Sequence, residues 1–246
     1  MLRKTVFIIL ILFSGLVSSE TEFKSQEEFS QWLTYYYLDP EPKNIVQAVR
    51  YMSERGFLDN GKTYPPIFGF LAGVFKENPS NVNSRVNNLS SLKDSSYGVV
   101  VLGLWYANLP NSKERVYAIL EKRPLLREQF NYLYQGSPMG ILQIPLEQGP
   151  WVLDALWGNF MATGNAEPVA RIMEALPWLD VKGETHKLRV AGAARWSLTS
   201  NAEQHKKVMV ICENEIKKQP PAVQDKLKTV ISESKKGPNE PIKPTQ

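Results

Sequence analysis

The sequence of 246 residues predicts an all-α fold made of stacked antiparallel helical hairpins. Two observations predict this fold: apolar residues recur at the i, i+3, i+4 and i+7 spacing of one helix face, and capped turns join these apolar stripes in pairs. One stripe contains Val169, Ile172, Met173 and Leu176, and Asn165 stands before it as a candidate N-cap. The same arrangement recurs along the chain, which indicates one architecture throughout.

Five hairpins share this plan of stripe, short turn and second stripe. They occupy residues 29–52, 67–89, 98–120, 153–176 and 188–216. Proline, asparagine or glycine stands in the connecting turns, where these residues favour the end of one helix and the start of the next. After the fifth hairpin, a last amphipathic segment is expected to cover the end of the stack through Val223, Leu227, Val230 and Ile231.

The second helices of the hairpins recur at a near-regular interval. Their anchor residues are Ile45, Val82, Val116 and Val169. The successive separations are 37, 34 and 53 residues. A period of 34–37 residues resembles tetratricopeptide-like helical repeats, and this resemblance implies a curved solenoid with a concave groove. It rests on period and hairpin plan, since Trp157 and Val169 stand where that family has small residues if Gly164 is its turn glycine. A globular all-helical domain without true repeats is the alternative.

The separation of 53 residues indicates extra chain between the third and fourth hairpins. Residues 125–134 can form a short helix, and the loop at 135–150 is rich in glycine and proline but also apolar. Insertions in repeat proteins gather on one face, often the binding face. Four residues in or beside this loop are therefore predicted to contact a partner: Met139, Ile141, Ile144 and Trp151. The alternative is that the loop packs its apolar side chains into the concave surface.

The first 19 residues have the layout of a secretory signal peptide. Arg3 and Lys4 precede an uninterrupted apolar run over residues 6–13, and the small residues that follow predict cleavage after Ser19. An uncleaved membrane anchor is the alternative, but this run is shorter than the roughly 20 residues that span a bilayer. We expect an exported protein, periplasmic or secreted, with no stable membrane insertion after cleavage.

The remaining chain is expected to form one helical domain over residues 20–233, followed by a polar, proline-rich, disordered tail over residues 234–246. The chain has 29 basic and 25 acidic residues, and cleavage removes two of the basic ones. A nearly balanced charge gives no reason to expect a nucleic acid as partner. Cys212 is the single cysteine, so no internal disulfide can form, and its apolar surroundings predict a buried small hydrophobe.

Residues that could carry catalysis or bind a metal are scarce. His205 is expected to face the core and His186 to be solvated, and together with the one cysteine they are too few for a zinc site. The sequence contains no known catalytic motif, so we predict no cofactor, no metal and no catalytic residue. Glu147 and Asp154 flank the inserted loop and are the only acids considered as a general acid/base pair. The aromatic cluster at 32–37 is expected to serve mainly in core packing.

Three functions remain open. The preferred hypothesis is an exported helical-repeat protein that binds a peptide or protein partner as an adaptor or scaffold. The second is an envelope or extracellular hydrolase that uses carboxylates in the groove. The third is a binder of a small ligand or sugar, which requires an aromatic-lined pocket near residues 35–37 or near the inserted loop.

Overall fold

The computed structural model describes residues 23–236. The predicted signal peptide, residues 1–19, lies outside the described residues, as do residues 237–246 of the predicted tail. Within the described range the chain forms twelve α-helices and several short 3-10 turns, with no β-strand, so the all-α prediction is confirmed. Among these helices none combines the length and apolar character needed to cross a bilayer.

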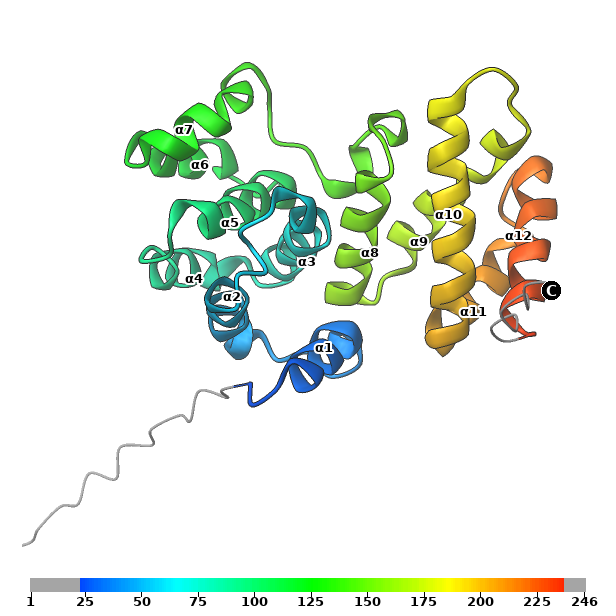
Figure 1. Cartoon of the computed structure of the whole chain (residues 1–246), viewed down its shortest axis with the longest axis horizontal. Coiled ribbons are helices and arrows are strands. Elements are labelled where there is room, and N and C mark those ends of the chain that lie inside the picture. The colour runs from blue at the N-terminus through cyan, green and yellow to red at the C-terminus, as the bar shows by residue number, and fades with distance from the viewer. Residues whose placement is uncertain (1–22, 237–246) are drawn as a thin grey trace, which may run out of the picture.

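Figure 1 shows the helices in chain order. The first six are α1 (Gln26–Tyr35), α2 (Ile45–Glu54), α3 (Tyr64–Glu77), α4 (Val82–Asn88), α5 (Asp94–Ala107) and α6 (Ser112–Glu121). The other six are α7 (Pro124–Gln129), α8 (Trp151–Thr163), α9 (Ala166–Met173), α10 (Thr185–Gln204), α11 (Lys206–Glu215) and α12 (Pro221–Ser234). The 3-10 turns used below are η1 (Tyr36–Leu38), η5 (Asn131–Gln135), η6 (Ile141–Gln143), η7 (Leu146–Gln148) and η8 (Leu176–Asp180).

Local sequence explains where these helices begin and end. Ser25 caps α1 by accepting a hydrogen bond from the Glu28 backbone N–H at 3.1 Å. Gly164 ends α8 in the left-handed region, at φ 64°, which a residue with a Cβ adopts only with strain. Asn165 occupies the predicted N-cap position of α9, but its side chain makes no capping hydrogen bond. Asn165 therefore marks the start of α9 by its extended backbone conformation and not by a hydrogen bond from its side chain.

The predicted apolar stripes form the core. The α9 stripe, with Val169 as its anchor, is fully buried. Cys212 is fully buried, as predicted, and His205 is only 1% exposed. Burial raises the pKa of the Cys212 thiol to about 12, so the thiol stays protonated. Each of these residues therefore serves in packing.

Helix α3 is the centre of the molecule, lying between α5 and α8 (Figure 1). Glycines let the α3 and α8 backbones touch. A Cβ on Gly69 of α3 would lie 2.0 Å from the carbonyl oxygen of Ala155, and a Cβ on Gly158 of α8 would lie 1.9 Å from that of Pro66. Asn159 Nδ2 also donates a hydrogen bond to the Gly69 carbonyl at 3.2 Å. This is the most extensive helix pair among the described residues.

The α3–α8 contact departs from a simple stack of hairpins. Neighbouring helices do pair as α5–α6, α8–α9 and α10–α11, which agrees with the hairpin plan. In a solenoid, however, the fourth hairpin would pack on the third, whereas here α8 returns to α3 of the second. This return explains the 53-residue separation between the anchors Val116 and Val169. The chain between α6 and α8 must be long enough to bring α8 back past α5 to α3.

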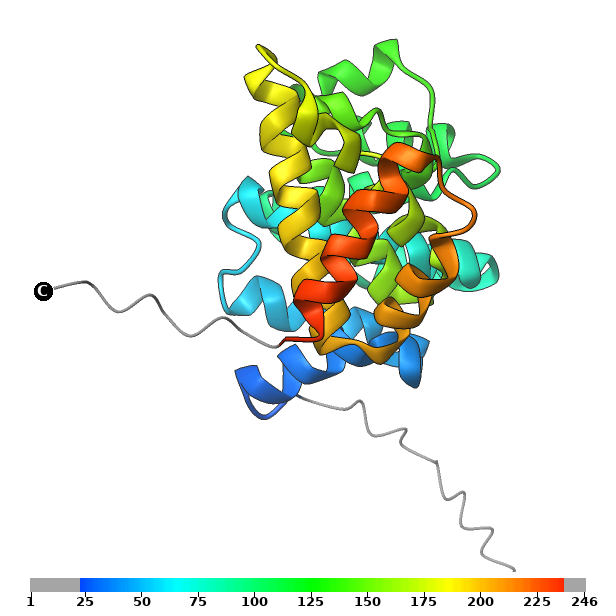
Figure 2. The same ribbon diagram turned by 90° about the vertical axis from the view of Figure 1, so that its right-hand side faces the viewer.

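The C-terminal helices form the other end of the molecule (Figures 1 and 2). Helix α10 packs against η7, η8, α9, α11 and α12, and residues on its remaining side, such as Trp196, are exposed. Helix α12 covers this end with the four apolar residues predicted for that role, all buried. It continues to Ser234, one residue beyond the predicted domain boundary.

Candidate functional site: a groove between three helices

A groove of about 730 Å³ lies over α5, between α4 and α6. The α4 side, including the turn that follows the helix, contributes Asn83, Val86, Asn87 and Ser90. The α6 side, including the residue that ends the helix, contributes Arg115, Ala118, Ile119 and Lys122. Both sets follow the i, i+3, i+4, i+7 spacing of one helix face, so two complete faces look at each other across the groove. Its volume is in the range of ligand-binding clefts.

The middle of the groove is apolar and its edges are polar. Val86 and Ile119 are half-buried, whereas Val82 and Val116 on the same two helices are fully buried. All four belong to apolar stripes with helical spacing, within the predicted hairpins at residues 67–89 and 98–120. The structure instead places Val86 and Ile119 at the groove, because no described helix covers α4 and α6 on this side.

One end of the groove is held by Arg123. Its Nη1 donates to the Leu92 carbonyl at 3.0 Å and to the Asp94 carboxylate, and its Nη2 donates to the Ser90 carbonyl. The guanidinium carbon lies 4.2 Å from the centre of the Tyr97 ring, a cation–π contact. Burial raises the pKa of Tyr97, against the opposing effect of Arg123, so the phenol stays neutral. Arg123 is thus a structural clamp whose charge is compensated by Asp94.

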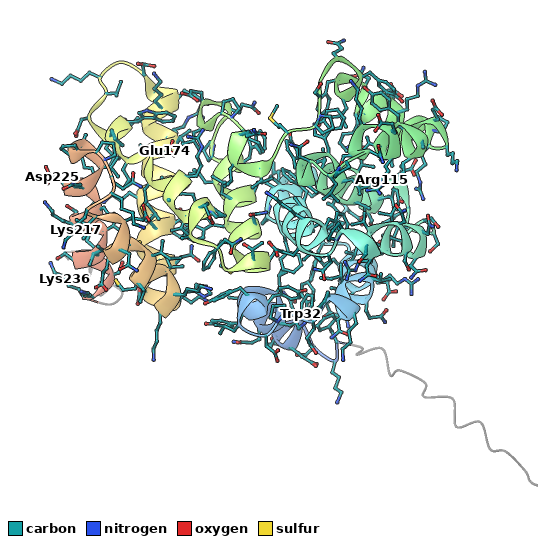
Figure 3. The ribbon with its side chains drawn as sticks, turned by 180° about the vertical axis from the view of Figure 1, so that it is seen from behind. Trp32, Arg115, Glu174, Lys217, Asp225 and Lys236 are labelled. Atoms are coloured by element: carbon teal, nitrogen blue, oxygen red, sulfur yellow. The ribbon has the colours of Figure 1, made fainter. Side chains whose placement is uncertain are left out.

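Two other cations on the groove remain uncompensated. Arg115, labelled in Figure 3, is half-buried, and Lys122 is exposed two turns further on, at the end of α6. Neither forms an ion pair with another residue in the range 23–236. Two helical turns place them about 10.5 Å apart along the helix axis. The α6 edge therefore offers two positive charges to whatever fills the groove.

A second concave site, an aromatic cleft of about 330 Å³, lies at the start of α3 and α8. Its aromatic lining comes from four segments: Tyr64 and Phe68 of α3, Tyr106 of α5, Tyr132 of η5 and Trp151 of α8. The Phe68 ring stacks on Tyr106, with centroids 5.1 Å apart, and meets Trp151 edge-on at 6.2 Å. Trp151 Nε1 donates to the Gln148 carbonyl at 3.0 Å, which fixes the indole.

The polar groups of the aromatic cleft are neutral. Burial raises the pKa of Tyr132 to about 12, with a further contribution from nearby Tyr106, and burial also raises the pKa of Tyr106. Tyr132 is nevertheless 51% exposed, so its side chain stands at the rim of the cleft. Neither hydroxyl is hydrogen-bonded to another described residue, and no charged side chain lines the cleft. The cleft offers flat rings and neutral hydrogen-bonding groups.

The structure separates the four residues predicted to contact a partner. Trp151 is half-buried in the aromatic cleft, and Met139 is partly buried against the core. Ile141 and Ile144 are only 5% and 1% exposed, because η6 packs against α8 and α9. Their burial assigns these two to the core and leaves Met139 and Trp151 as the accessible members of the set. At Ile141 and Ile144 the inserted segment thus packs against α8 and α9.

The two acids beside the inserted segment show no sign of acting together. Glu147 and Asp154 are both exposed, and the raised pKa of Asp154 comes from partial desolvation by neighbouring atoms, with no contribution from Glu147. In the part of the chain that the structure describes, no three of its His, Cys, Asp and Glu residues are grouped to hold a metal ion. The aromatic cluster at 32–37 packs internally: Trp32, also labelled in Figure 3, meets Tyr36 edge-on at 5.1 Å, and its Nε1 donates to Glu41 Oε2 at 3.0 Å.

Sequence reasoning missed the groove, although one signal was present. Arg115 and Lys122 flank Ile119 on the same face of α6, and two cations on a face otherwise assigned to the core are unusual. Likewise Asn83 and Asn87 accompany Val86 on α4. Such mixed stripes indicate a helix face that is only partly covered.

No family model, no curated protein and no solved structure matches this chain. The function must therefore be argued from the site itself.

Proposed function

We propose that this protein is an exported adaptor that holds an amphipathic helix of a protein partner in the groove between α4 and α6. The observation that supports this most is the pair of facing helix stripes, apolar in the middle and polar at the edges. A helix seated in such a groove presents apolar residues at i, i+3, i+4 and i+7, the known pattern of helix-in-groove recognition. The export part of the proposal rests on the signal-peptide pattern of residues 1–19.

The charges of the groove specify the partner further. Arg115 and Lys122 lack ionic partners among the described residues, so the bound helix carries acidic residues about two turns apart. Opposite charges at the rim mainly raise the association rate and select the partner, whereas the apolar contacts in the middle supply most of the affinity. The binding is therefore expected to weaken as ionic strength rises.

The test uses two synthetic amphipathic helical peptides that differ only in charge. Both carry leucine at i, i+3, i+4 and i+7, and one carries two glutamates seven residues apart where the other carries lysines. We expect the acidic peptide to bind the wild type at least about tenfold more tightly than the basic one, measured by fluorescence anisotropy. The Arg115→Glu/Lys122→Glu variant should reverse this preference.

Two further variants complete the design. The control Lys182→Glu/Lys217→Glu changes the net charge equally on exposed residues away from the groove; Lys217 lies at the opposite end of the molecule from Arg115 in Figure 3. It should leave both affinities unchanged. Ala118→Trp places a large ring in the groove from an exposed position, and should abolish binding without lowering the melting temperature. Equal binding of the two peptides by the wild type, or equal weakening by the control, contradicts the proposal.

The aromatic cleft supports a second candidate function, the binding of a neutral sugar-like ligand. Its flat rings suit the apolar faces of a sugar, and its uncharged phenols and the Gln148 amide suit hydroxyl groups. Titration of neutral oligosaccharides by calorimetry tests this function. Tyr132→Ala should then lose the binding, whereas Leu125→Ala, an exposed apolar residue of α7 outside the cleft, should keep it. Unchanged binding by Tyr132→Ala would remove the cleft from consideration.

A further inference from the structure

Helix α10 carries an unusually exposed tryptophan in its outward face. Trp196 is 73% exposed, and Leu188, two turns earlier, is 46% exposed. Between them stands Gly192, where an added Cβ would meet no atom within 4 Å. These exposures and the open space at Gly192 indicate that no described helix covers this side of α10. Large exposed aromatic residues of this kind are typical centres of protein interfaces.

The residues around Trp196 are arranged symmetrically. Two small residues, Gly192 and Ser200, lie four positions before and four positions after Trp196. Two residues of opposite charge, Arg189 and Glu203, lie seven positions before and seven positions after it. Spacings of four and seven keep all five residues on one helix face. All five are exposed, and neither Arg189 nor Glu203 forms an ion pair with another described residue.

We propose that this face of α10 binds a second copy of the chain, with the two α10 helices antiparallel about a two-fold axis at Trp196. In such an isologous contact residue i meets residue j, and j meets i. Arg189 of each copy then faces Glu203 of the other, and Gly192 faces Ser200. The small residues on either side leave room for the two indole rings, which stack at the axis.

The charge pattern selects this occupant over others. A parallel copy would place Arg189 against Arg189 and Glu203 against Glu203, and an unrelated helix need not match these two residues with opposite charges. An antiparallel copy supplies that match by symmetry, and twice. A helix of 20 residues is about 30 Å long, so one helix face buries less than the roughly 1,000 Å² expected of a stable interface. The dimer is therefore weak and concentration-dependent.

Charge reversal tests the geometry directly by sedimentation velocity from micromolar to millimolar protein. The wild type should dimerise with rising concentration. Arg189→Glu alone and Glu203→Arg alone should each weaken the dimer at least about tenfold, because each creates two like-charge contacts. The double variant Arg189→Glu/Glu203→Arg restores opposite charges at both contacts and should dimerise like the wild type.

Two more measurements complete the test. An equimolar mixture of the two single variants should form a heterodimer, because one copy then carries a carboxylate at both charged positions and the other copy carries a guanidinium at both. Trp196→Ala should abolish dimerisation with an unchanged circular dichroism spectrum, and Lys182→Glu, an exposed charge outside α10, should leave it unchanged. A wild type that stays monomeric at millimolar concentration, or a double variant that fails to recover, overturns the proposal.

Discussion

The glycine contact between α3 and α8 gives the sharpest prediction about stability. In the variant Gly69→Ala the new Cβ would lie 2.0 Å from the Ala155 carbonyl oxygen and 2.7 Å from its carbon. Real Cβ atoms essentially never come closer than 3.0 Å to such atoms, so the two backbones must separate by about 1 Å. No side chain can rotate away to relieve this clash, since the obstructing atoms belong to the main chain.

The magnitude follows from what the separation costs. Overpacking in a core typically costs about 1–3 kcal/mol, and a gap of 0.5–1 Å forfeits a quarter to a half of each dispersion contact along the interface. The separation also stretches the hydrogen bond from Asn159 to the Gly69 carbonyl. The intrinsic helix preference of alanine offsets only about 0.5–1 kcal/mol. We expect a net loss of about 3 kcal/mol, which lowers the melting temperature by roughly 6–12 °C in a domain of this size.

Thermal unfolding followed by circular dichroism at dilute protein concentration checks this value. Gly158→Ala, which makes the reciprocal clash with the Pro66 carbonyl, should lower the melting temperature by a similar amount. The matched control is Gly192→Ala in α10, where the added methyl group meets nothing and should raise the melting temperature by about 1–4 °C. If the melting temperature of Gly69→Ala lies within about 2 °C of that of the wild type, the close contact between the α3 and α8 backbones is refuted.

Three other predictions concern the core and the clamp. Burial lowers the pKa of His205 below its ordinary value of 6.5, so the folded state holds the neutral ring. The contribution of His205 to stability is complete above pH 6.5 and falls as the pH drops below it, because the unfolded chain then binds a proton more readily. His205→Phe should therefore flatten this part of a plot of melting temperature against pH. Arg123→Ala removes the hydrogen bonds and the ring contact at the end of the groove and should cost roughly 2–4 kcal/mol in chemical denaturation, whereas Lys122→Ala should stay within about 0.5 kcal/mol of the wild type. Deleting residues 136–149 removes buried side chains, including Ile144, each contributing roughly 1.5–3 kcal/mol, and should abolish cooperative unfolding; a cooperative transition near that of the wild type would show the segment to be dispensable.

The sequence predicted the helices well because helix periodicity is a local property. The stripe at Val169 became the buried face of α9, and the segment predicted as a short helix at 125–134 became α7 and η5. The burial of His205 followed from its place in the repeated hairpin, and that of Cys212 from its apolar sequence neighbours. The unusual length between the third and fourth hairpins was also visible, although its role as a connection across α5 was not.

The binding surfaces were predicted poorly because they depend on which helices cover which faces. Val86 and Ile119 have the same apolar character as their fully buried neighbours, and only the missing cover over α4 and α6 makes them line a groove. Conversely, the sequence predicted that apolar residues of the inserted segment contact a partner, yet Ile141 and Ile144 are buried where η6 packs against α8 and α9.

By itself, the sequence determined the all-α class, the segments that form helical hairpins and the apolar face of each helix. Only the tertiary structure decided that α8 packs on α3, that Gly69 and Gly158 are the points of closest approach, and that the faces of α4 and α6 stay open. The physical reason is that helix periodicity is set by hydrogen bonds and side chains four residues apart, whereas helix partners are chosen by shape complementarity between residues about ninety positions apart.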